Sequence, residues 1–312
     1  MKLNRLETRL LDLVQAEFPL SGEPYAELGR RLGISQDEVI EHIKKLEAAG
    51  IVREIGPVLD SRCLGYQTTL VVMKISQDYL DKASKIINEH PGISHGYERE
   101  HQLNLWFTLS LPPQADLEAE VQRLSQAIGA EAVFSLPVLK QFKIGTHLGG
   151  GTLPSPVELS AIERRVINEL QQDLPLTSAP FGQMAARLNM GVAEFLARCQ
   201  SLLQRGVMRR FGASVNHREV GFRANAMACW VAPPEMVDAA AQKLVNLGEV
   251  SHCYERKTNP LWQYNLFAMI HGHTREACQE VAERVSRETG LEDYVLLFST
   301  REIKKKRVRY LV

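Results

Sequence analysis

The spacing of hydrophobic positions changes along the first half of the chain from a helical period to a strand period. Over residues 1–50, apolar side chains recur every three or four positions, which is the spacing of one helix face. This spacing predicts helices over residues 6–18, 25–33 and 36–48. Ser35 is a good N-cap, with Glu38 at the capping-box position, and Gly50 ends the third helix. Ile51–Ile55 then alternates as a strand does. Three helices followed by a wing strand are typical of a winged helix-turn-helix module.

Beyond residue 60, strands alternate with amphipathic helices. The β-branched run Gln67–Ile75 predicts the first of these strands. The same reasoning predicts strands over 67–75, 93–100, 103–111 and 133–144, and helices over 78–89 and 115–128. The resulting order, βαββαβ, is that of a ferredoxin-like module.

This arrangement occurs twice, because the second half of the chain resembles the first. The matching segments are Leu10–Leu20 with Val166–Leu176, Ser94–Arg99 with Ser251–Arg256, and Asn104–Phe107 with Asn265–Ala268. The difference in residue number between matching positions is larger for the last of these matches than for the other two. The second copy is therefore longer between its Tyr-Glu-Arg and Asn-Leu motifs. Its expected strands cover 222–232, 250–256, 263–271 and 293–303, and its expected helices cover 234–247 and 274–289. A period of about half the chain indicates a duplicated two-domain unit.

The sequence thus predicts the α+β fold class, as a tandem duplication of a winged helix-turn-helix module and a ferredoxin-like module. The segment between the copies is rich in Gly and Pro, which is typical of a linker. We expect the copies to form a pseudo-dimer within one chain, and further dimerisation stays open. The expected boundaries are 1–60 and 61–147 for the modules of the first copy, 148–156 for the linker, and 157–217 and 218–312 for the modules of the second copy.

Composition narrows the classes of function. Lys plus Arg and Asp plus Glu both number 37, whereas general binders of polyanions usually carry a basic excess. No stretch has the features of a signal peptide or the length of a membrane span, so we expect a cytoplasmic protein without membrane contact. The five cysteines are scattered and form no CxxC motif. This pattern predicts buried thiols, with no disulfides and no metal site made by the protein alone.

The helix that would enter a DNA groove is acidic in both copies. In the first copy, Asp37, Glu38 and Glu41 lie at its beginning, where they would meet phosphate groups. In the second copy, the segment Met190–Ala197 contains Glu194 and almost no side chain that reads bases. We therefore expect no DNA binding, and we expect these modules to pack the two copies together.

A winged helix followed by βαββαβ is the layout of the Lrp/AsnC regulators, and each copy resembles that family over nearly its whole length. A more specific resemblance is to siroheme decarboxylases. Residues 96–108 (Gly-Tyr-Glu-Arg-Glu-His-Gln-Leu-Asn-Leu-Trp-Phe-Thr) and 136–144 are similar to the first component of that enzyme, and residues 254–272 are similar to the second. The fused order resembles the NirDL form.

The resemblance implies a non-redox carboxy-lyase of heme d1 biosynthesis. Siroheme would lose the carboxyl groups of two acetate side chains and give 12,18-didecarboxysiroheme. No separate cofactor is implied, because the iron tetrapyrrole is the substrate. Contact with other proteins of heme d1 biosynthesis stays open.

A pyrrole acetate that loses CO₂ leaves a carbon that must be protonated, and histidine is the natural donor near neutral pH. The resemblance favours His101 and His147 as an acid/base pair. The second copy has no histidine at the position matching either residue, which indicates a single catalytic site. His271 is a third candidate, as an acid or as an axial ligand of the substrate's iron, and the ligand role is also open to His101. His95 and His252 match each other, which is more typical of structural residues.

The substrate's carboxylates require cations, and Arg binds a carboxylate through two hydrogen bonds. Lys140 and Lys143 are three residues apart in one expected strand, so they share a face only if a bulge intervenes. Trp106 and Phe107 lie on opposite faces of another strand, so one is expected in the core, and the other could lie against the macrocycle. Each of the charged candidates, Arg or Lys, could instead be a solvated group on the surface. The expected substrate-binding residues are Arg53, Arg99, Trp106, Lys140, Lys143, Arg209, Arg210, Arg256, His271 and Arg301.

Two other functions remain open at this point. The first is a ligand-responsive DNA-binding regulator of Lrp/AsnC type, which the acidic helices oppose. The second is a carrier that binds a tetrapyrrole without turnover.

Overall fold

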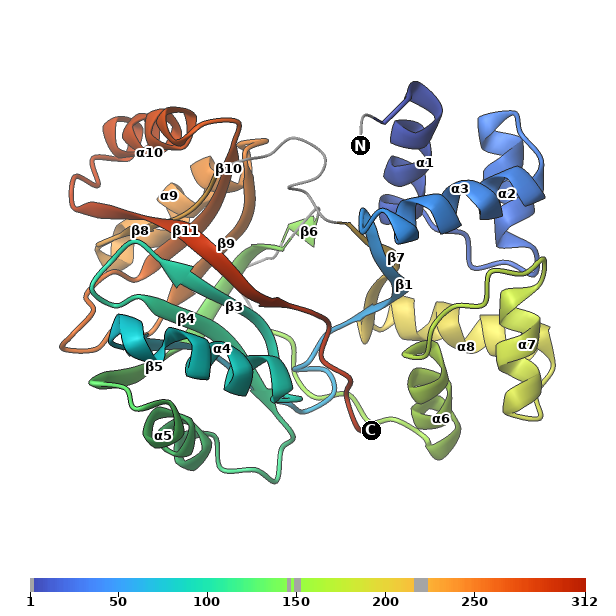
Figure 1. Ribbon diagram of the computed structural model, residues 1–312, viewed down its shortest axis with the longest axis horizontal. Coiled ribbons are helices and arrows are strands. Elements are labelled where there is room, and N and C mark those ends of the chain that lie inside the picture. Colours follow the sequence, from blue (N-terminus) through green and yellow to red (C-terminus); the bar gives the residue numbers. More distant parts are fainter. Residues whose placement is uncertain (1–2, 145–146, 149–152, 216–223) are drawn as a thin grey trace. The chain divides into compact units, whose positions relative to one another are not determined.

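A computed structural model describes residues 3–144, 147–148, 153–215 and 224–312 (Figure 1). The chain divides into two compact units, each built from like modules of both copies. The helical unit comprises Met1–Gly65, Ser155–Gly221 and Tyr310–Val312, and the α/β unit comprises Tyr66–Pro154 and Phe222–Arg309. The division into four modules with the boundaries given above stays a prediction.

The described part of the helical unit contains three helices from each copy. They are α1 (Arg5–Ala16), α2 (Pro24–Leu32) and α3 (Gln36–Ala48) in the first copy, and α6 (Ala161–Leu170), α7 (Pro180–Arg187) and α8 (Val192–Gln204) in the second. The capping box expected at the start of α3 is present. Glu38 donates its backbone N–H to Ser35 Oγ (3.3 Å), and Ser35 donates its backbone N–H to the Glu38 carboxylate (2.8 Å).

The wing strands expected in both copies pair with each other. β1 (Val52–Leu59) and β7 (Met208–Val215) form a two-stranded antiparallel ribbon, with Ile55 opposite Ala213. Aromatic side chains extend this contact between the copies, because the ring of Phe18 lies 6.4 Å from that of Phe181 and 5.5 Å from that of Phe211. Within this unit, the two helix-turn-helix modules therefore pack on each other.

Where the structure describes the α/β unit, it contains two four-stranded sheets with the ferredoxin-like strand order, β5-β2-β4-β3 and β11-β8-β10-β9. The first copy supplies β2 (Gln67–Lys74), α4 (Leu80–Glu89), β3 (Ile93–Arg99), β4 (Leu105–Leu111), α5 (Leu117–Ile128) and β5 (Ala132–Ile144). The second copy supplies β8 (Ala224–Trp230), α9 (Pro234–Val245), β9 (Val250–Arg256), β10 (Leu266–Gly272), α10 (Arg275–Thr289) and β11 (Tyr294–Lys305). The short strand β6 (His147–Leu148) pairs with the end of β5.

The last strand of each copy belongs to both sheets. β5 pairs with β2 as far as Pro137 and with β9 from Val138 onward. In the same way, β11 pairs with β8 as far as Phe298 and with β3 from Ser299 onward. Eight strands therefore close into a ring in which every neighbouring pair is antiparallel.

Three apolar cores follow from this arrangement. The helices α4 and α5 cover the outer face of one sheet, and α9 and α10 cover the outer face of the other (Figure 1). A third core lies between the inner faces of the sheets and contains Leu70, Trp106, Met227, Trp262 and Phe267. Residues from both copies thus share the interior of the ring.

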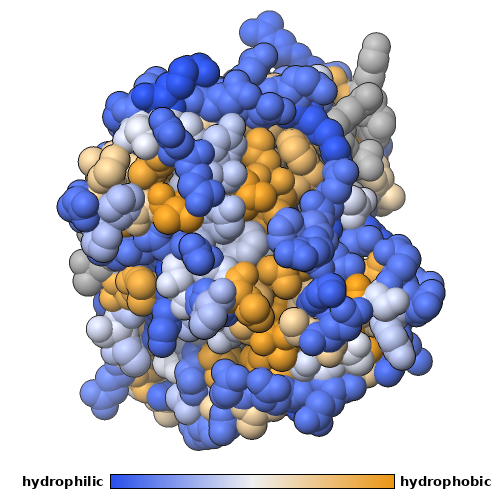
Figure 2. All heavy atoms as spheres, turned by 90° about the vertical axis from the view of Figure 1, so that its left-hand side faces the viewer, coloured by the Kyte–Doolittle hydropathy of each residue, from blue (hydrophilic) through white to orange (hydrophobic). Residues whose placement is uncertain are grey.

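On the side of the molecule formed by the α/β unit, apolar side chains gather in separate patches between polar ones (Figure 2). Within the described residues, no helix combines the length and the apolar content that crossing a bilayer requires.

Candidate functional site

Two turns, one from each copy, meet inside the α/β unit. His101 lies in the turn between β3 and β4, and Trp262 lies in the turn between β9 and β10. Their ring centroids are 5.7 Å apart, with the ring planes nearly perpendicular. When the copies are aligned at the match of Asn104 with Asn265, Trp262 falls on the position of His101. The second copy therefore puts an indole where the first has the expected catalytic histidine.

A backbone donor fixes the protonation pattern of His101. Leu103 donates its N–H to His101 Nδ1 over 3.0 Å, so the proton of the neutral imidazole lies on Nε2. Partial burial lowers the pKa of His101 below its usual value, because burial disfavours the imidazolium. His101 therefore presents an Nε2–H group next to the indole of Trp262.

Of the aromatic side chains around His101, Trp106 and Trp262 are buried and Tyr264 is partly buried. Trp262 lies 5.1 Å from Trp106 and 4.9 Å from Tyr264, measured between ring centroids. The Nε1–H of Trp262 is buried and has no acceptor among the described residues. An unsatisfied buried donor is costly, and a carboxylate that entered this place would satisfy it.

Trp106 and Phe107 point to opposite faces of β4, as expected, but both are core residues. Phe107 packs beneath α4 and α5, and Trp106 packs in the inner core, where its Nε1–H donates to the Leu103 carbonyl over 2.6 Å. Trp106 is only 1% exposed. The structure therefore does not support an open face of Trp106 for the macrocycle.

Arg99 and Arg256 donate hydrogen bonds to β11 and β5 at the positions where these strands pass from one sheet to the other. Arg99 Nη1 donates to the Leu297 carbonyl (2.8 Å) and to Ser299 Oγ (3.2 Å). At the equivalent place, Arg256 Nη1 donates to the Leu136 carbonyl over 2.9 Å. Burial lowers the pKa of Arg99 to about 10, so its guanidinium remains charged at neutral pH. Its Nε–H has no partner among the described residues, which leaves one donor of this expected clamp for a carboxylate.

Lys140 and Arg301 contact helices of the other copy. Lys140 pairs with Asp238 on α9 (2.9 Å), and Arg301 pairs with Asp81 on α4 (3.1 Å). Lys143 Nζ also reaches α9, because it donates to the Val245 carbonyl over 2.8 Å. The bulge that Lys140 and Lys143 needed is present, since the pairing of β5 with β9 shifts register twice in this segment. In the structure these side chains hold strands to helices, and their role in substrate binding stays a prediction.

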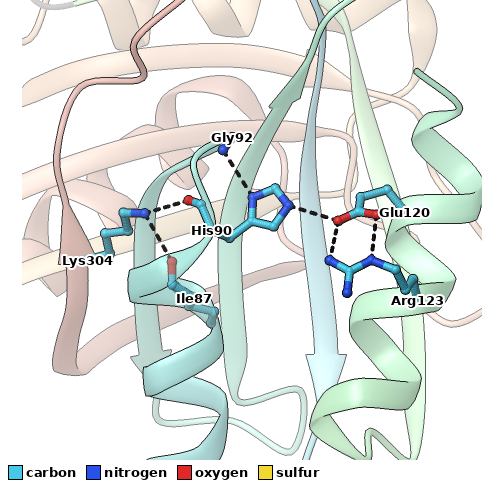
Figure 3. A network of polar contacts seen from close by, with 6 residues as sticks. All are labelled: Ile87, His90, Gly92, Glu120, Arg123 and Lys304. Atoms are coloured by element: carbon cyan, nitrogen blue, oxygen red, sulfur yellow. Dashed lines mark hydrogen bonds and ion pairs between the residues drawn. The ribbon is translucent and has the colours of Figure 1, made fainter. Parts of the chain in front are cut away.

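Lys304, the counterpart of Lys143, belongs to a larger polar network (Figure 3). Its Nζ donates to the carbonyls of Ile87 (3.1 Å) and His90 (2.7 Å) at the end of α4. The His90 ring in turn contacts Glu120 over 2.8 Å, and Glu120 pairs with Arg123. The network joins β11 of the second copy to two helices of the first copy.

Three of the expected clamps lie in the helical unit. Arg209 forms an ion pair with the buried carboxylate of Asp60 (2.6 Å), and Arg210 Nη1 donates to the Gln15 carbonyl over 2.6 Å. Arg53 lies where the pairing of β1 with β7 shifts register. These residues and His101 therefore belong to different compact units.

His271 lies at one end of the ring in a group of polar side chains. Its ring nitrogens contact Asn225 Oδ1 (2.6 Å) and Ser251 Oγ (2.5 Å). The backbone of His147 lies in the same row of strands, because Ile144 pairs with His147 on one side and with His252 on the other. The side chain of His147 lies outside the described residues.

The backbones of the two histidines expected to form an acid/base pair lie apart along the strands. His101 lies in the turn that meets the β9–β10 turn, beyond Arg256. Arg256 lies four residue steps along β9 from His252, whose row contains the His147 backbone. At a strand rise of about 3.3 Å per residue this backbone separation is roughly 13 Å, and the pairing of the two side chains stays a prediction.

Both kinds of module match known families. Residues 7–53 and 163–209 match the family described as siroheme decarboxylase NirDL-like HTH domain, and residues 63–143 and 219–304 match the AsnC-like ligand binding domain. The siroheme decarboxylase of Hydrogenobacter thermophilus is 38% identical over 316 residues, which cover 97% of this chain and 94% of that protein. The chain belongs to the siroheme decarboxylase family. This finding confirms the resemblance and the duplicated α+β fold expected from the sequence.

Two further siroheme decarboxylases show how the fold is used. The crystal structure of NirDL in co-complex with an iron-uroporphyrin III analogue has a TM-score of 0.76 and 36% identity, over 99% of this chain and 95% of that chain. The beta subunit of Methanosarcina barkeri siroheme decarboxylase is 42% identical over 145 residues, which cover 46% of this chain and 95% of that subunit. In this family, one copy of the repeat thus also occurs as a separate subunit.

Several residues of the candidate site are not predicted by the sequence motifs. Trp262 and Tyr264 would have been found by extending the match at Asn265 back through the turn that precedes it. Ser251 belongs to the repeated Ser-His motif and Asn225 has no distinctive sequence signal, but only the fold brings both to His271.

Proposed function

We propose that this protein is a siroheme decarboxylase that converts siroheme to 12,18-didecarboxysiroheme in heme d1 biosynthesis. The observation that carries the proposal is the match to the Hydrogenobacter thermophilus enzyme over 97% of the chain. A relative with the same two copies has been crystallised with an iron-uroporphyrin III analogue, which supports an iron tetrapyrrole as substrate. A cytoplasmic location and contacts with other proteins of heme d1 biosynthesis stay predictions.

The reaction exchanges one carboxyl group for one proton at each acetate. The bond between the methylene carbon and the carboxylate breaks, CO₂ leaves, and the electron pair stays on the methylene carbon until it takes a proton. A methyl group results, and no oxidant or reductant is consumed. The protein must therefore hold the carboxylates and supply protons in a site from which bulk water is excluded.

We assign His101 to proton supply for one acetate. Its Nε2–H can donate to a substrate carboxylate while Leu103 N–H holds the ring in place. When CO₂ leaves, the Nε2–H of His101 gives its proton to the methylene carbon, and Nε2 regains a proton from water, while Nδ1 keeps its hydrogen bond from Leu103 N–H. The Nε–H of Arg99 and the Nε1–H of Trp262 are the nearby candidates to hold the carboxylate.

His147 remains the second proposed catalytic residue. The separation along β9 favours roles for His101 and His147 on different substituents of the macrocycle over a hydrogen-bonded acid/base pair. Lys140, Lys143, Arg301 and the helical unit's Arg53, Arg209 and Arg210 remain proposed contacts for the remaining carboxylates.

Ligation of the substrate's iron is compatible with His271 and not with His101. A histidine ligand usually donates its second ring N–H to a neighbouring acceptor. His271 Nδ1 faces the acceptor Asn225 Oδ1, whereas His101 Nδ1 accepts a hydrogen bond from Leu103. Iron binding through His271 Nε2 would break the contact with Ser251, so the two roles exclude each other, and the contact present in the structure leads us to assign His271 to Ser251 and not to the iron.

Contacts on α3 favour the ionised forms of Glu38 and Glu41, two of the carboxylates expected to oppose DNA binding. Hydrogen bonds from the backbone and side chain of Ser35 lower the pKa of Glu38, and Glu41 lies 3.0 Å from Lys44. These contacts support the prediction that α3 is a poor reader of DNA.

The test is anaerobic incubation of the purified full-length chain with siroheme, followed by mass spectrometry of the tetrapyrrole. We expect loss of two carboxyl groups. His101→Ala and His147→Ala should each slow the reaction by roughly 10²–10⁴-fold, the usual contribution of a positioned proton donor. His273→Ala, which changes an exposed histidine, is the control. Siroheme that is bound but unchanged would indicate a carrier, and absence of binding would favour the regulator.

A further inference from the structure

The polar group at the second-copy end of the ring is continuous from one imidazole to another. Ser251 Oγ lies 2.5 Å from His271 Nε2 and 2.8 Å from His252 Nδ1. His271 Nδ1 lies 2.6 Å from Asn225 Oδ1. Three strands, β8, β9 and β10, position these four side chains, with Asn225 and His271 directly opposite each other in the register. One hydroxyl group thus bridges two histidines.

The acceptor at one end sets the direction of the hydrogen bonds. Asn225 Oδ1 can only accept, so the His271 proton lies on Nδ1, and His271 Nε2 accepts from the Ser251 hydroxyl. The Ser251 oxygen then accepts from His252 Nδ1–H, which leaves the lone pair of His252 on Nε2. A proton that arrives at His252 Nε2 can therefore pass to His271 when the protons along Ser251 shift by one bond. The transfer is reversible and leaves the number of protons in the relay unchanged.

The first copy has the same backbone arrangement without a second imidazole. Thr68 pairs with Ser110 in the register where Asn225 pairs with His271, and their hydroxyl oxygens lie 2.9 Å apart. Ser94 Oγ still contacts His95 Nδ1, over 2.9 Å. The duplication thus preserves the serine–histidine contact in both copies, whereas, among the described residues, the bridge to a second histidine is present in the second copy alone.

We propose that His252, Ser251 and His271 form a proton relay that supplies the proton consumed by decarboxylation at this end of the ring. The inference rests on the proposed function. In each turnover His252 Nε2–H gives its proton to the methylene carbon as CO₂ leaves, and the relay regains one proton from water. His271 is a positioning residue that stores the proton and acts through Ser251 and His252. Because the proton can lie on either of the two imidazoles, the relay keeps it close to the substrate without holding it on a single side chain.

Ser251→Ala tests the relay, with Ser94→Ala as the matched control. Both variants remove a hydroxyl group from a histidine Nδ1, but only Ser251→Ala separates two imidazoles. We expect Ser251→Ala to lower kcat for CO₂ release by about tenfold or more, with KM little changed, and to reduce the solvent deuterium isotope effect of the proton-transfer step. Ser94→Ala should retain wild-type kcat, and Ser251→Thr, which keeps the hydroxyl group, should restore the rate.

The outcomes separate the two proposals. A wild-type chain that decarboxylates siroheme while Ser251→Ala and Ser94→Ala behave alike would overturn the relay alone. A wild-type chain that leaves siroheme intact would overturn the proposed function and, with it, the relay. If Ser251→Ala does not fold, the double variant Asn225→Thr with His271→Ser replaces it, because the first copy shows that these side chains fit the same strand positions. That variant should show the same loss of kcat and of isotope effect, and unchanged kinetics would overturn the relay.

Discussion

At the residue scale, the chemistry of His101 depends on a backbone group that sequence motifs do not reveal. The N–H of Leu103 occupies Nδ1, so only Nε2 can meet a ligand. The motif around His101 identifies the residue, but the tautomer follows from the tight turn between β3 and β4. The same turn brings His101 to Trp262, which belongs to the other copy of the repeat. Sequence spacing alone could not predict that contact, because it depends on how the copies close the ring.

The pKa of His101 gives a pH prediction for stability. Burial lowers that pKa in the folded chain from the usual 6.5, so between the two values the unfolded chain binds more protons. The stability linked to His101 is therefore present above pH 6.5 and is lost as the pH falls through the folded-state value. We expect the wild type to lose more stability on acidification than His101→Asn, whose amide oxygen can still accept from Leu103 N–H.

Urea unfolding between pH 5 and 8 measures this difference. The three tryptophans, Trp106, Trp230 and Trp262, all lie in the α/β unit, so their fluorescence reports on that unit. Parallel pH dependences for the wild type and His101→Asn would contradict the prediction.

At the element scale, β5 and β11 are the strands that join the copies within the α/β unit. The alternating sequence of each strand predicts its existence and nearly its length, because the period of two is a local property. The change of sheet within each strand is not local, and it coincides with bulges that turn cations toward the helices of the other copy. Lys140 and Lys143 were expected to need a bulge in order to share a face, and the structure confirms that condition.

Lys304 offers a test of how firmly a crossing strand is held. Its ammonium group is the donor to two carbonyls at the end of α4, and only 9% of the residue is exposed. Lys304→Met removes both hydrogen bonds and leaves those carbonyls without this donor. We expect the free energy of unfolding of the α/β unit to fall by about 1–3 kcal/mol.

The control is Lys85→Met, which changes an exposed lysine on the same helix α4. It should change the free energy of unfolding by no more than about 0.5 kcal/mol. Tryptophan fluorescence during urea unfolding measures both variants. Equal effects of the two substitutions would show that the contacts at the end of α4 contribute little.

At the scale of the whole molecule, the sequence predicted the elements and the duplication far better than the site. Helices and strands follow from periodicity and capping residues, such as Ser35 and Glu38, which act over a few positions. The site depends on contacts between residues of the two copies. Arg99, expected to bind substrate, holds Leu297 of the other copy, and Trp106 is enclosed by the inner core. Residues of different copies meet because the strands of both copies close into one ring. The sequence of one copy does not show in which register its strands pair with those of the other copy.

The closed ring makes the linker dispensable for holding the copies together. Three antiparallel pairings join the copies directly, β1 with β7, β3 with β11 and β5 with β9, and all three cores contain or adjoin strands that reach across. A protease site placed between Leu148 and Leu153 should therefore give two fragments that elute together from a gel-filtration column and separate only under denaturing conditions. The uncut chain is the control for elution volume.

Separate elution of the fragments under native conditions would contradict this prediction, because it would mean that chain connectivity, and not strand exchange, keeps the copies in register. The expected result also links the fused chain to its two-subunit relatives. If each copy's last strand completes the other copy's sheet, the two copies need no covalent bond, and a subunit of the length of the Methanosarcina barkeri beta subunit would find its sheet edges completed by a partner in the same way. Fusion would then chiefly fix the ratio and the concentration of the two copies, which changes how readily they assemble and leaves the geometry around His101 unaltered.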